Sequence, residues 1–450
     1  MSKKFSSALA LLTLVCLLAG SLLPAASGQT DTSRAAQNAA IVATADAVLK
    51  ETSEIRELSI LPGVKSGAQS RSQIERMIIK NLDADTTPEE MHANEALLKA
   101  FGLAPPDFAY RSFLIKLLSE QVAGYYDPIA QQFYLADWIE IDGQKPVMAH
   151  ELTHALQDQH FNLKRFEKWR KGDSDAELAA HALIEGDATL AMTLYLANHL
   201  AIAIAFVRTA QEMSSEQYNH APRAIRESLL FPYQQGSTWA SQVHKRGGWA
   251  MVSKAFAKLP QSTEQILHVE KYFSYERPVK LTLPNFRTAL GPGWRLIDND
   301  VNGEWGYYLA LDEYLNDLPV SRAAAEGWGG DRFAIYEGPG ESDVFLAQST
   351  AWDTAADAKE FYDAYLARTE KRFPELSKFG AAELGNGSQK QEWRSTTGRG
   401  VMELRGSRVV ILEGIPEKAN SKSLLSTIWQ QRPQSRPQAR PQSRSKTRKS

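Results

Sequence analysis

The pattern of apolar and polar residues changes character along this chain. From residue 30 to about 102, alanine and leucine recur at helical spacing, with breaks near Pro62-Gly63 and Thr87-Pro88. Residues 121–126 and 132–136 instead have the composition of two short strands around a turn. These patterns predict a mostly helical region that carries a small sheet.

The next segment predicts a helix that packs on several sides. Met148, Leu152 and Leu156 recur at helical spacing, so they should contact a core. Pro146 precedes them and suits a first helical turn, where its missing N–H costs nothing. A surface helix with polar residues facing solvent is the plainer alternative.

A second helix is predicted to begin near Asp175, because Ser174 and Glu177 have the spacing of a capping box. It leads directly into the apolar run 187–207, which is long enough to cross a bilayer. Asn198 lies in the middle of that run, so we expect a buried core helix. No stable membrane span is expected in the mature chain.

Beyond residue 278 the pattern indicates a small α+β module over residues 279–430, without a catalytic motif. Its predicted elements are two strands, a helix and two further strands: 332–337, 344–349, 355–372, 391–396 and 401–412. The final stretch, 431–450, is basic and rich in proline, and we expect it to be a disordered, solvated tail.

The N-terminus has the features of an export signal. Lys3 and Lys4 precede the apolar stretch Ala8–Leu23, and the small residues Ala26-Ser27-Gly28 offer a cleavage site. A retained membrane anchor is the alternative. The only cysteine, Cys16, lies inside this segment. Residues 1–28 are therefore expected to direct export to the periplasm or the medium, and any metal must be held by histidine and carboxylate.

Composition excludes some classes of function. The chain is 43% hydrophobic, which suffices for a large core and suggests two domains. The formal net charge is −2, but the basic residues of the tail have no acid beside them, so the remainder is clearly acidic. The body has no basic patch with interleaved aromatic residues, and we expect no nucleic-acid binding.

The most informative motif is H-E-x-x-H at His150, Glu151 and His154. On a helix the two histidines lie about 40° apart on one face, one turn from each other. Two neutral imidazoles so placed can bind one Zn²⁺, and Glu151 is placed to take a proton from a metal-bound water.

Two residues compete for the role of third ligand. His160 has the position of the last histidine in the metzincin pattern, but that pattern needs a glycine where this chain has Gln157. If the helix continues, His160 lies about 15 Å along the axis from His150. Glu185, two to three turns into the second helix, would complete a His₂Glu site of thermolysin type. We therefore favour Glu185.

The run Val147–Phe161, followed by Glu185-Gly186-Asp187-Ala188, resembles a loosely described group of exported bacterial and archaeal proteins regarded as zinc metallopeptidases. That group is similar to the gluzincin branch of the zincins. Val122–Pro128 and Leu259–His268 also resemble it, so the likeness covers roughly residues 110–280. It implies a zincin-like metallopeptidase domain over 106–278, preceded by a helical region over 29–105.

The resemblance has one departure and leaves some roles open. Thermolysin-like enzymes have an aspartate four residues after the glutamate ligand, where this chain has Thr189. Asp187 lies about 200° around the helix from Glu185, which leaves open whether it orients His150. The resemblance also implies a late histidine that stabilises the oxyanion, and His268 is the candidate for it.

Other features of a zincin have candidates as well. Tyr125 and Tyr126 are alternative donors to the oxyanion. The strand before the metal helix usually lies at a sheet edge in zincins and pairs with an extended peptide substrate. A plain structural hairpin is the alternative interpretation of residues 121–136.

These patterns together predict an exported zinc metallopeptidase of α+β fold that acts on a peptide or protein substrate. Its expected metal ligands are His150, His154 and Glu185, with Glu151 as the general base and His268 as a further catalytic candidate. A catalytically inactive zincin-fold binding protein is one alternative. A metzincin-like peptidase with a different third ligand is the other. Neither substrate sequence nor oligomeric state follows from these patterns.

Overall fold

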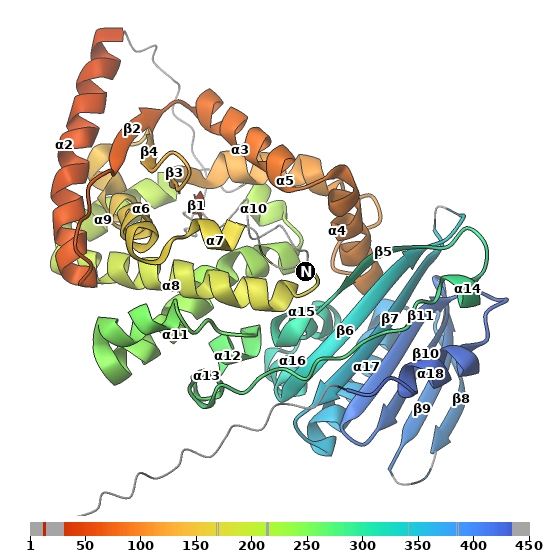
Figure 1. Cartoon of the computed structure of the whole chain (residues 1–450). Coiled ribbons are helices and arrows are strands. Elements are labelled where there is room, and N and C mark those ends of the chain that lie inside the picture. The colour runs from red at the N-terminus through yellow and green to blue at the C-terminus, as the bar shows by residue number, and fades with distance from the viewer. Residues whose placement is uncertain are drawn as a thin grey trace, which may run out of the picture.

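The computed structural model describes residues 12–14, 31–167, 169, 171–212, 216–340, 342–383, 385 and 387–433. Most of the predicted export signal, including Cys16, and the tail beyond residue 433 lie outside the described residues. The protein is an α+β protein with a helical half and a half built on a large sheet, as Figure 1 shows.

The N-terminal part of the helical half contains four helices and one strand. Their bounds are α2 Asp31–Arg56, β2 Lys65–Gln69, α3 Arg71–Asp85, α4 Pro88–Phe101 and α5 Tyr110–Gln121. The two predicted breaks fall between helices, and Thr87 with Glu90 forms a capping box at the start of α4. The strand β2 was not predicted, because its sequence, KSGAQ, has no apolar alternation.

The small sheet has the order β1-β3-β4-β2. The two predicted strands are confirmed as β3, Val122–Asp127, and β4, Gln132–Ala136, which pair antiparallel. The expectation that the strand before the metal helix is an edge strand is wrong, because β4 also pairs with β2, in parallel. Since β2 belongs to residues 29–105, that region shares one sheet with residues 106–278.

The outer edge of β3 is covered by a strand from the segment predicted as the export signal. This strand, β1, spans Leu12–Leu14 and runs antiparallel to β3. Leu12 is paired with Tyr125 and Leu14 with Val122. Within the described residues, β3 therefore has a pairing partner on both sides, on the outer side only over Val122–Tyr125.

The two helices that carry the predicted ligands follow the small sheet. Helix α6 spans Ile141–Phe161, and after the short α7, Lys164–Glu167, helix α8 spans Ser174–Asn198. Residues 146–158 of α6 are all buried, so the alternative of a surface helix is wrong. Pro146 is inside α6 and not in its first turn as predicted, because the helix begins five residues earlier.

Helix α8 begins at Ser174, next to the predicted Asp175, but its N-terminal cap and its other end differ from prediction. Its N-cap residue is Asp173, whose side chain makes no capping hydrogen bond, and the backbone N–H of Ser174 donates to Asp300 Oδ1. The Ser174 hydroxyl donates instead to Asp300 Oδ2 at 2.6 Å, so the predicted capping box does not form. At the other end α8 stops at Asn198, and α9, Leu200–Glu212, leaves it at an angle of 116°. The run 187–207 is therefore two helices, and Leu200 in the second is 75% exposed.

Within the described residues, no single helix has the length and apolar composition of a membrane span. Among the described helices, only α8 and the first part of α9 taken together have that length and composition, and the chain bends sharply between the two.

The long helix α11 packs along α8 (Figure 1) and completes the helical half. It spans Arg223–Ala255 with a kink at Gly247 and Gly248, after the short α10, Glu216–His220. Three short helices lead into the second half: α12 Thr263–Leu267, α13 Val269–Ser274 and α14 Arg287–Leu290.

The second half is a seven-stranded sheet in the order β5-β6-β7-β11-β10-β9-β8, which is antiparallel throughout. Its strands are β5 Arg295–Asp300, β6 Trp328–Glu337, β7 Val344–Trp352, β8 Ser377–Glu383, β9 Gln389–Ser395, β10 Gly398–Arg405 and β11 Arg408–Ile415. The predicted strand 401–412 is two strands, β10 and β11, that meet in a tight turn. Helices α15 Gly303–Leu315, α16 Leu318–Ala325, α17 Ala355–Arg372 and α18 Ser421–Trp429 pack around the sheet, and only α17 was predicted.

One contact between the two halves lies at the C-terminal end of α4. The guanidinium groups of Arg368 and Arg372, on α17, donate to the carbonyl oxygens of Lys99, Ala100 and Phe101. These are carbonyls of the last helical turn, where partners within a helix run out, although the Lys99 carbonyl also accepts from the N–H of the cap residue Gly102. The C-terminal module thus provides a charged cap for an N-terminal helix.

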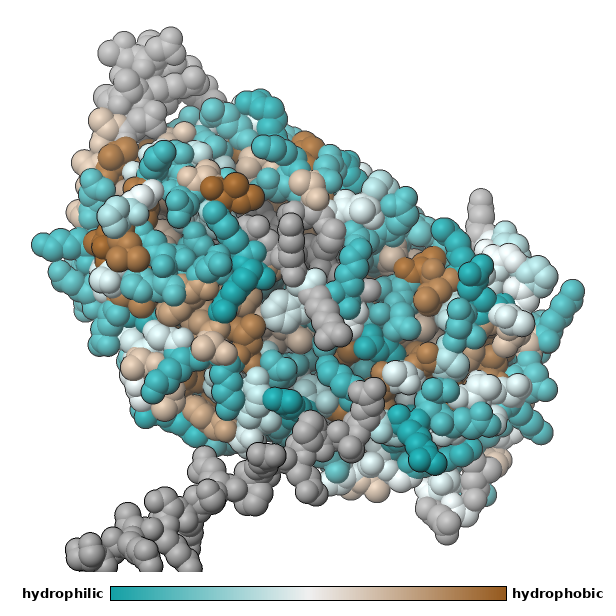
Figure 2. Space-filling view, in the orientation of Figure 1, coloured by the Kyte–Doolittle hydropathy of each residue, from teal (hydrophilic) through white to brown (hydrophobic). Residues whose placement is uncertain are grey.

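The face of the molecule in Figure 2 is covered mainly by hydrophilic side chains, with apolar ones in small separate groups. Large exposed apolar side chains include Ile129 and Leu200, each about three-quarters exposed. Such scattered groups are usual on protein surfaces.

Candidate metal centre

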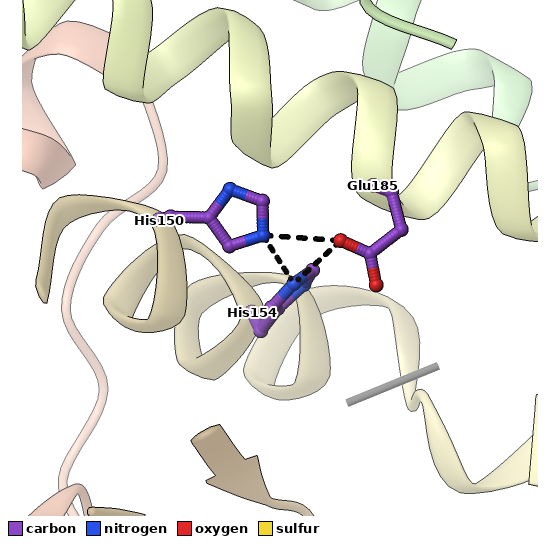
Figure 3. A group of neighbouring side chains, drawn as sticks. All are labelled: His150, His154 and Glu185. Carbon is purple, nitrogen blue, oxygen red and sulfur yellow. Dashed lines mark hydrogen bonds and ion pairs between the residues drawn. The ribbon is translucent and has the colours of Figure 1, made fainter. Parts of the chain in front are cut away.

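Three predicted ligands meet in the helical half. His150 and His154 project from α6 and Glu185 from α8, and their ends point toward one another (Figure 3). Glu185 Oε2 lies 3.0 Å from His150 Nε2 and 3.3 Å from His154 Nε2, and the two Nε2 atoms are 3.1 Å apart. All three side chains are at most 3% exposed.

The place of Glu185 depends on a close crossing of α8 and α11. A Cβ atom at Gly186 would lie 2.2 Å from backbone atoms of Gly236, and a Cβ at Gly236 would lie 2.2 Å from the Ala182 carbonyl oxygen. Real Cβ contacts are not that short, so only glycine permits this crossing. The glycine after Glu185 therefore lets α8 approach α11 in backbone contact.

The spacing of the three donor atoms suits a tetrahedral zinc ion. Zinc–ligand distances of about 2.0–2.1 Å place neighbouring ligand atoms about 3.3–3.4 Å apart. The three observed separations, 3.0–3.3 Å, are close to that value. The second carboxylate oxygen, Glu185 Oε1, is buried and has no hydrogen-bond partner among the described residues. Two imidazoles and a carboxylate are also a donor set that zinc prefers, so the residues fit the ion.

The charges of these groups are strongly coupled. Burial favours the neutral form of Glu185, but the neighbouring histidines outweigh it and lower the pKa of Glu185 to about 2. Burial likewise opposes a charge on His154, but Glu185 and, more weakly, Glu151 raise the pKa of His154 to about 9. Burial lowers the pKa of His150. The centre thus carries an ionised carboxylate that attracts a cation or a proton.

Glu151 is fully buried next to the ligands in sequence. It lies near enough for its charge to raise the pKa of His154. The structure thus places the predicted base in the electrostatic neighbourhood of the metal ligands.

Further from the ligands, three residues connect to His154. Gln157 Oε1 lies 2.8 Å from His154 Nδ1, and Gln157 Nε2 donates to Asp187 Oδ2 at 2.9 Å. Asp187 in turn forms a buried ion pair with Arg56, whose Nε lies 2.5 Å from its Oδ1. The hydrogen bonds of Asp187 thus lead through Gln157 to His154, whereas its effect on His150, for which the sequence had left the question open, is electrostatic.

Two predicted candidates are placed elsewhere. His160 is exposed at the end of α6, and its Nε2 lies 2.8 Å from the Ser59 carbonyl oxygen. The helix does continue through position 157, so His160 does not join the two other histidines. His268, between α12 and α13, has its Nε2 2.8 Å from Glu304 Oε1 on α15, which raises the pKa of His268.

The region around His268 lies toward the start of α8. Thr263 of α12 donates to Asp175, which precedes Glu185 by about 15 Å along the helix axis. The contacts of His268 and of Thr263 are thus with residues other than the three predicted ligands, and the role of His268 as an oxyanion donor stays a prediction.

The two predicted tyrosines bond to other side chains, and a third tyrosine lies near the ligands instead. The hydroxyl of Tyr125 donates to Gln69 Oε1 and that of Tyr126 to Asp158 Oδ2, each at 3.1 Å. Tyr233, on α11, was missed by the sequence analysis, yet its ring centre is 6.0 Å from that of His150. It stands one turn before Gly236, so the glycine crossing brings it to the ligands, and no sequence pattern indicated this.

A second acidic group, Glu264, Glu276 and Asp353, could also hold a cation by geometry. Its centre is already taken by the ammonium group of Lys271, which is paired with Glu264 at 2.5 Å and with Asp353. This group is therefore an internal ion-pair network.

Comparison with known proteins concerns the C-terminal half. Residues 294–424 match a family described as a domain of unknown function, DUF8575. This range runs from the start of β5 into α18, so it covers the large sheet and none of the predicted metal ligands. No curated protein and no solved structure matches the chain.

Proposed function

We propose that this protein is an exported zinc-dependent metallopeptidase of gluzincin type, with a zincin-like helical half. The proposal rests above all on the convergence of His150 Nε2, His154 Nε2 and Glu185 Oε2 at separations suited to one zinc ion. Three protein ligands leave one position of a tetrahedral ion for water or substrate, as in catalytic zinc sites.

When bound, zinc would supply a Lewis acid that polarises the scissile carbonyl and lowers the pKa of water. His150, His154 and Glu185 would hold the ion. Glu151 would take a proton from the attacking water as its oxygen bonds to the carbonyl carbon, and pass that proton to the leaving amine nitrogen as the C–N bond breaks. Tyr233 lies close enough to His150 to contact the substrate.

An extended peptide would bind along β3. This strand lies next to β4, the strand directly before α6, and within the described residues its outer side pairs only with the three residues of β1. A substrate strand in the place of β1 would gain the same backbone hydrogen bonds, which makes binding tolerant of side-chain sequence.

The burial of the ligands favours a second candidate, a protein that holds a metal without catalysis. Structural zinc sites are closed, and here His150, His154 and Glu151 are each at most 1% exposed. A purely structural site has no use for Glu151, which distinguishes the two candidates.

The test compares wild type with Glu151→Gln at equal zinc content, using a broad pool of peptides. Glutamine keeps the shape of the side chain but has no basic site, so turnover should fall about 10²–10⁴-fold while zinc and fold are kept. Equal cleavage by both proteins would contradict the role of Glu151. Bound zinc without cleavage by wild type would favour the non-catalytic candidate, and no bound zinc would refute both.

A further inference from the structure

We propose that Gln157, Asp187 and Arg56 are positioning residues that fix the ring of His154 with Nε2 as the metal-binding atom. The inference rests on the proposed metal site and extends it to two further residues on α6 and α8 and to one residue on another helix, α2. None of the three residues is itself a ligand, and Arg56 comes from α2, far from the metal motif in sequence.

The first step concerns the orientation of the Gln157 amide. Its Nε2 lies 3.0 Å from the Ile184 carbonyl oxygen and 2.9 Å from Asp187 Oδ2. A carbonyl and a carboxylate can only accept hydrogen bonds, so the NH₂ end of the amide must face them. The opposite end, Oε1, therefore faces His154.

The second step concerns the proton on His154. Since Gln157 Oε1 can only accept, His154 Nδ1, 2.8 Å away, must carry the hydrogen. In a neutral imidazole the other nitrogen then has a free lone pair. That nitrogen, Nε2, is the atom that faces Glu185 and His150. The amide thus selects the tautomer that can bind a metal.

The third step explains why the amide stays in place. Arg56 donates to both oxygens of Asp187, through Nε at 2.5 Å and Nη2 at 3.1 Å, and neither side chain is exposed. The guanidinium also lies 4.4 Å from the ring of Trp249 and donates to Ser253 on α11. Asp187 is therefore held by a permanent charge that is itself fixed on a second helix.

The two metal histidines differ in this respect. Nδ1 of His150 is buried and has no hydrogen-bond partner among the described residues. The protein therefore orders His154 in advance, whereas His150 has no such constraint in the described part of the chain. Hydrogen bonds of this kind to a ligand's second nitrogen typically change metal affinity about 10–100-fold.

The test uses matched substitutions on α6. Gln157→Met keeps the length of the side chain and removes both links, so zinc affinity, measured by competition with a chelator, should fall about 10–100-fold. Gln159→Met is the control, because Gln159 bonds only to the Leu61 backbone in the described structure. Equal zinc affinity in wild type and Gln157→Met would overturn the inference.

A double-mutant cycle tests the route. Asp187→Asn should weaken zinc binding in the wild-type background and add little in the Gln157→Met background, because Asp187 acts through Gln157. Full additivity of the two losses would show that Asp187 does not act through this amide, and would overturn that part of the inference.

A second readout is independent of metal. In zinc-free protein with ¹⁵N-labelled histidine, NMR should show a protected Nδ1 proton on His154 in wild type and Gln159→Met. The protection of this proton should be lost in Gln157→Met and reduced in Asp187→Asn. The second variant provides the test if Gln157→Met does not fold. Absence of that proton in wild type would overturn the inference. Its presence in a protein that binds no zinc would refute the proposed function and leave the hydrogen-bond chain intact.

Discussion

Gly186 and Gly236 lie in backbone contact where α8 crosses α11. The crossing has two consequences for the proposed site. It brings Glu185, the preceding residue on α8, to the two histidines, and it brings Tyr233, one turn earlier on α11, to the ring of His150. Helix packing and ligand geometry are therefore coupled at one point.

We expect Gly236→Ala to disturb both the packing of α8 on α11 and the geometry of the predicted ligands. The added methyl would lie 2.2 Å from the Ala182 carbonyl oxygen, so the two helices must separate. Overpacking of this kind lowers the free energy of unfolding by about 1–3 kcal/mol, and the displaced Glu185 should weaken zinc binding. Urea unfolding and chelator competition measure the two effects. Thr238→Ala, at an exposed position of the same helix, should change neither.

The two possible third ligands make opposite predictions for zinc content. Glu185→Ala should remove most of the zinc, because it leaves two ligands, whereas His160→Ala should leave the content near one ion per chain. His160 contacts the Ser59 carbonyl and not the other histidines. Elemental analysis of the purified variants decides the matter, and loss of zinc from His160→Ala alone would restore the metzincin alternative.

Stability should depend on pH through Asp175. Burial outweighs the hydrogen bonds from Thr263 and raises the pKa of Asp175 from 3.8 to about 8. Between about pH 4 and pH 8 the folded chain therefore holds a proton that the unfolded chain has released. The contribution of Asp175 to the free energy of unfolding should fall as the pH rises through this window.

Asp175→Asn should flatten that part of the pH dependence, since asparagine stays neutral and still accepts from Thr263. Urea unfolding of zinc-free protein at about pH 5, 6.5 and 8 measures the slope. Asp83→Asn, at an exposed ion pair with Arg111, is the control. The same slope in wild type and Asp175→Asn would show that Asp175 is not the group that titrates.

The contact between the halves should also be measurable. Arg372→Met removes the donors to the carbonyl oxygens of Lys99 and Ala100 at the end of α4. Hydrogen bonds from a charged donor contribute about 1.5–3 kcal/mol, so the free energy of unfolding should fall by about that much. Arg111→Met, whose exposed ion pair with Asp83 contributes little, should leave stability nearly unchanged. If Arg372→Met leaves the free energy of unfolding unchanged, this contact does not contribute to joining the halves.

Local patterns predicted the part of the site that lies on single helices. The spacing of His150 and His154 requires only that α6 be a helix, and the choice of Glu185 over His160 follows from the lack of a glycine at position 157. The same Gln157 is one turn from His154, so its hydrogen bond is a relationship between positions i and i+3 that the sequence contains.

Relationships between distant segments could not be predicted. In sequence, Arg56 cannot be distinguished from other basic residues at helix ends, and no neighbouring residue indicates that Asp187 is its partner. The capping-box pattern at Ser174 failed because Asp300, from the other half, takes its hydroxyl. β2 was missed for the same reason: its pairing with β4 compensates for a sequence with little strand propensity.

The contacts of Arg56 also set an order of events during synthesis. Its hydrogen-bond partners are Asp187 and Ser253, the second of them 197 residues later in the chain. Until α11 has left the ribosome, Arg56 lacks its contact with Ser253. The hydrogen bonds that lead from Arg56 through Asp187 and Gln157 to His154 are then not yet held at their far end. Contacts over such long loops form late, because loop closure costs entropy before any contact compensates for it. A nascent chain with α6 and α8 outside the ribosome therefore already carries all three predicted ligands, but Arg56, which holds Asp187, gains its contact with Ser253 only when α11 docks.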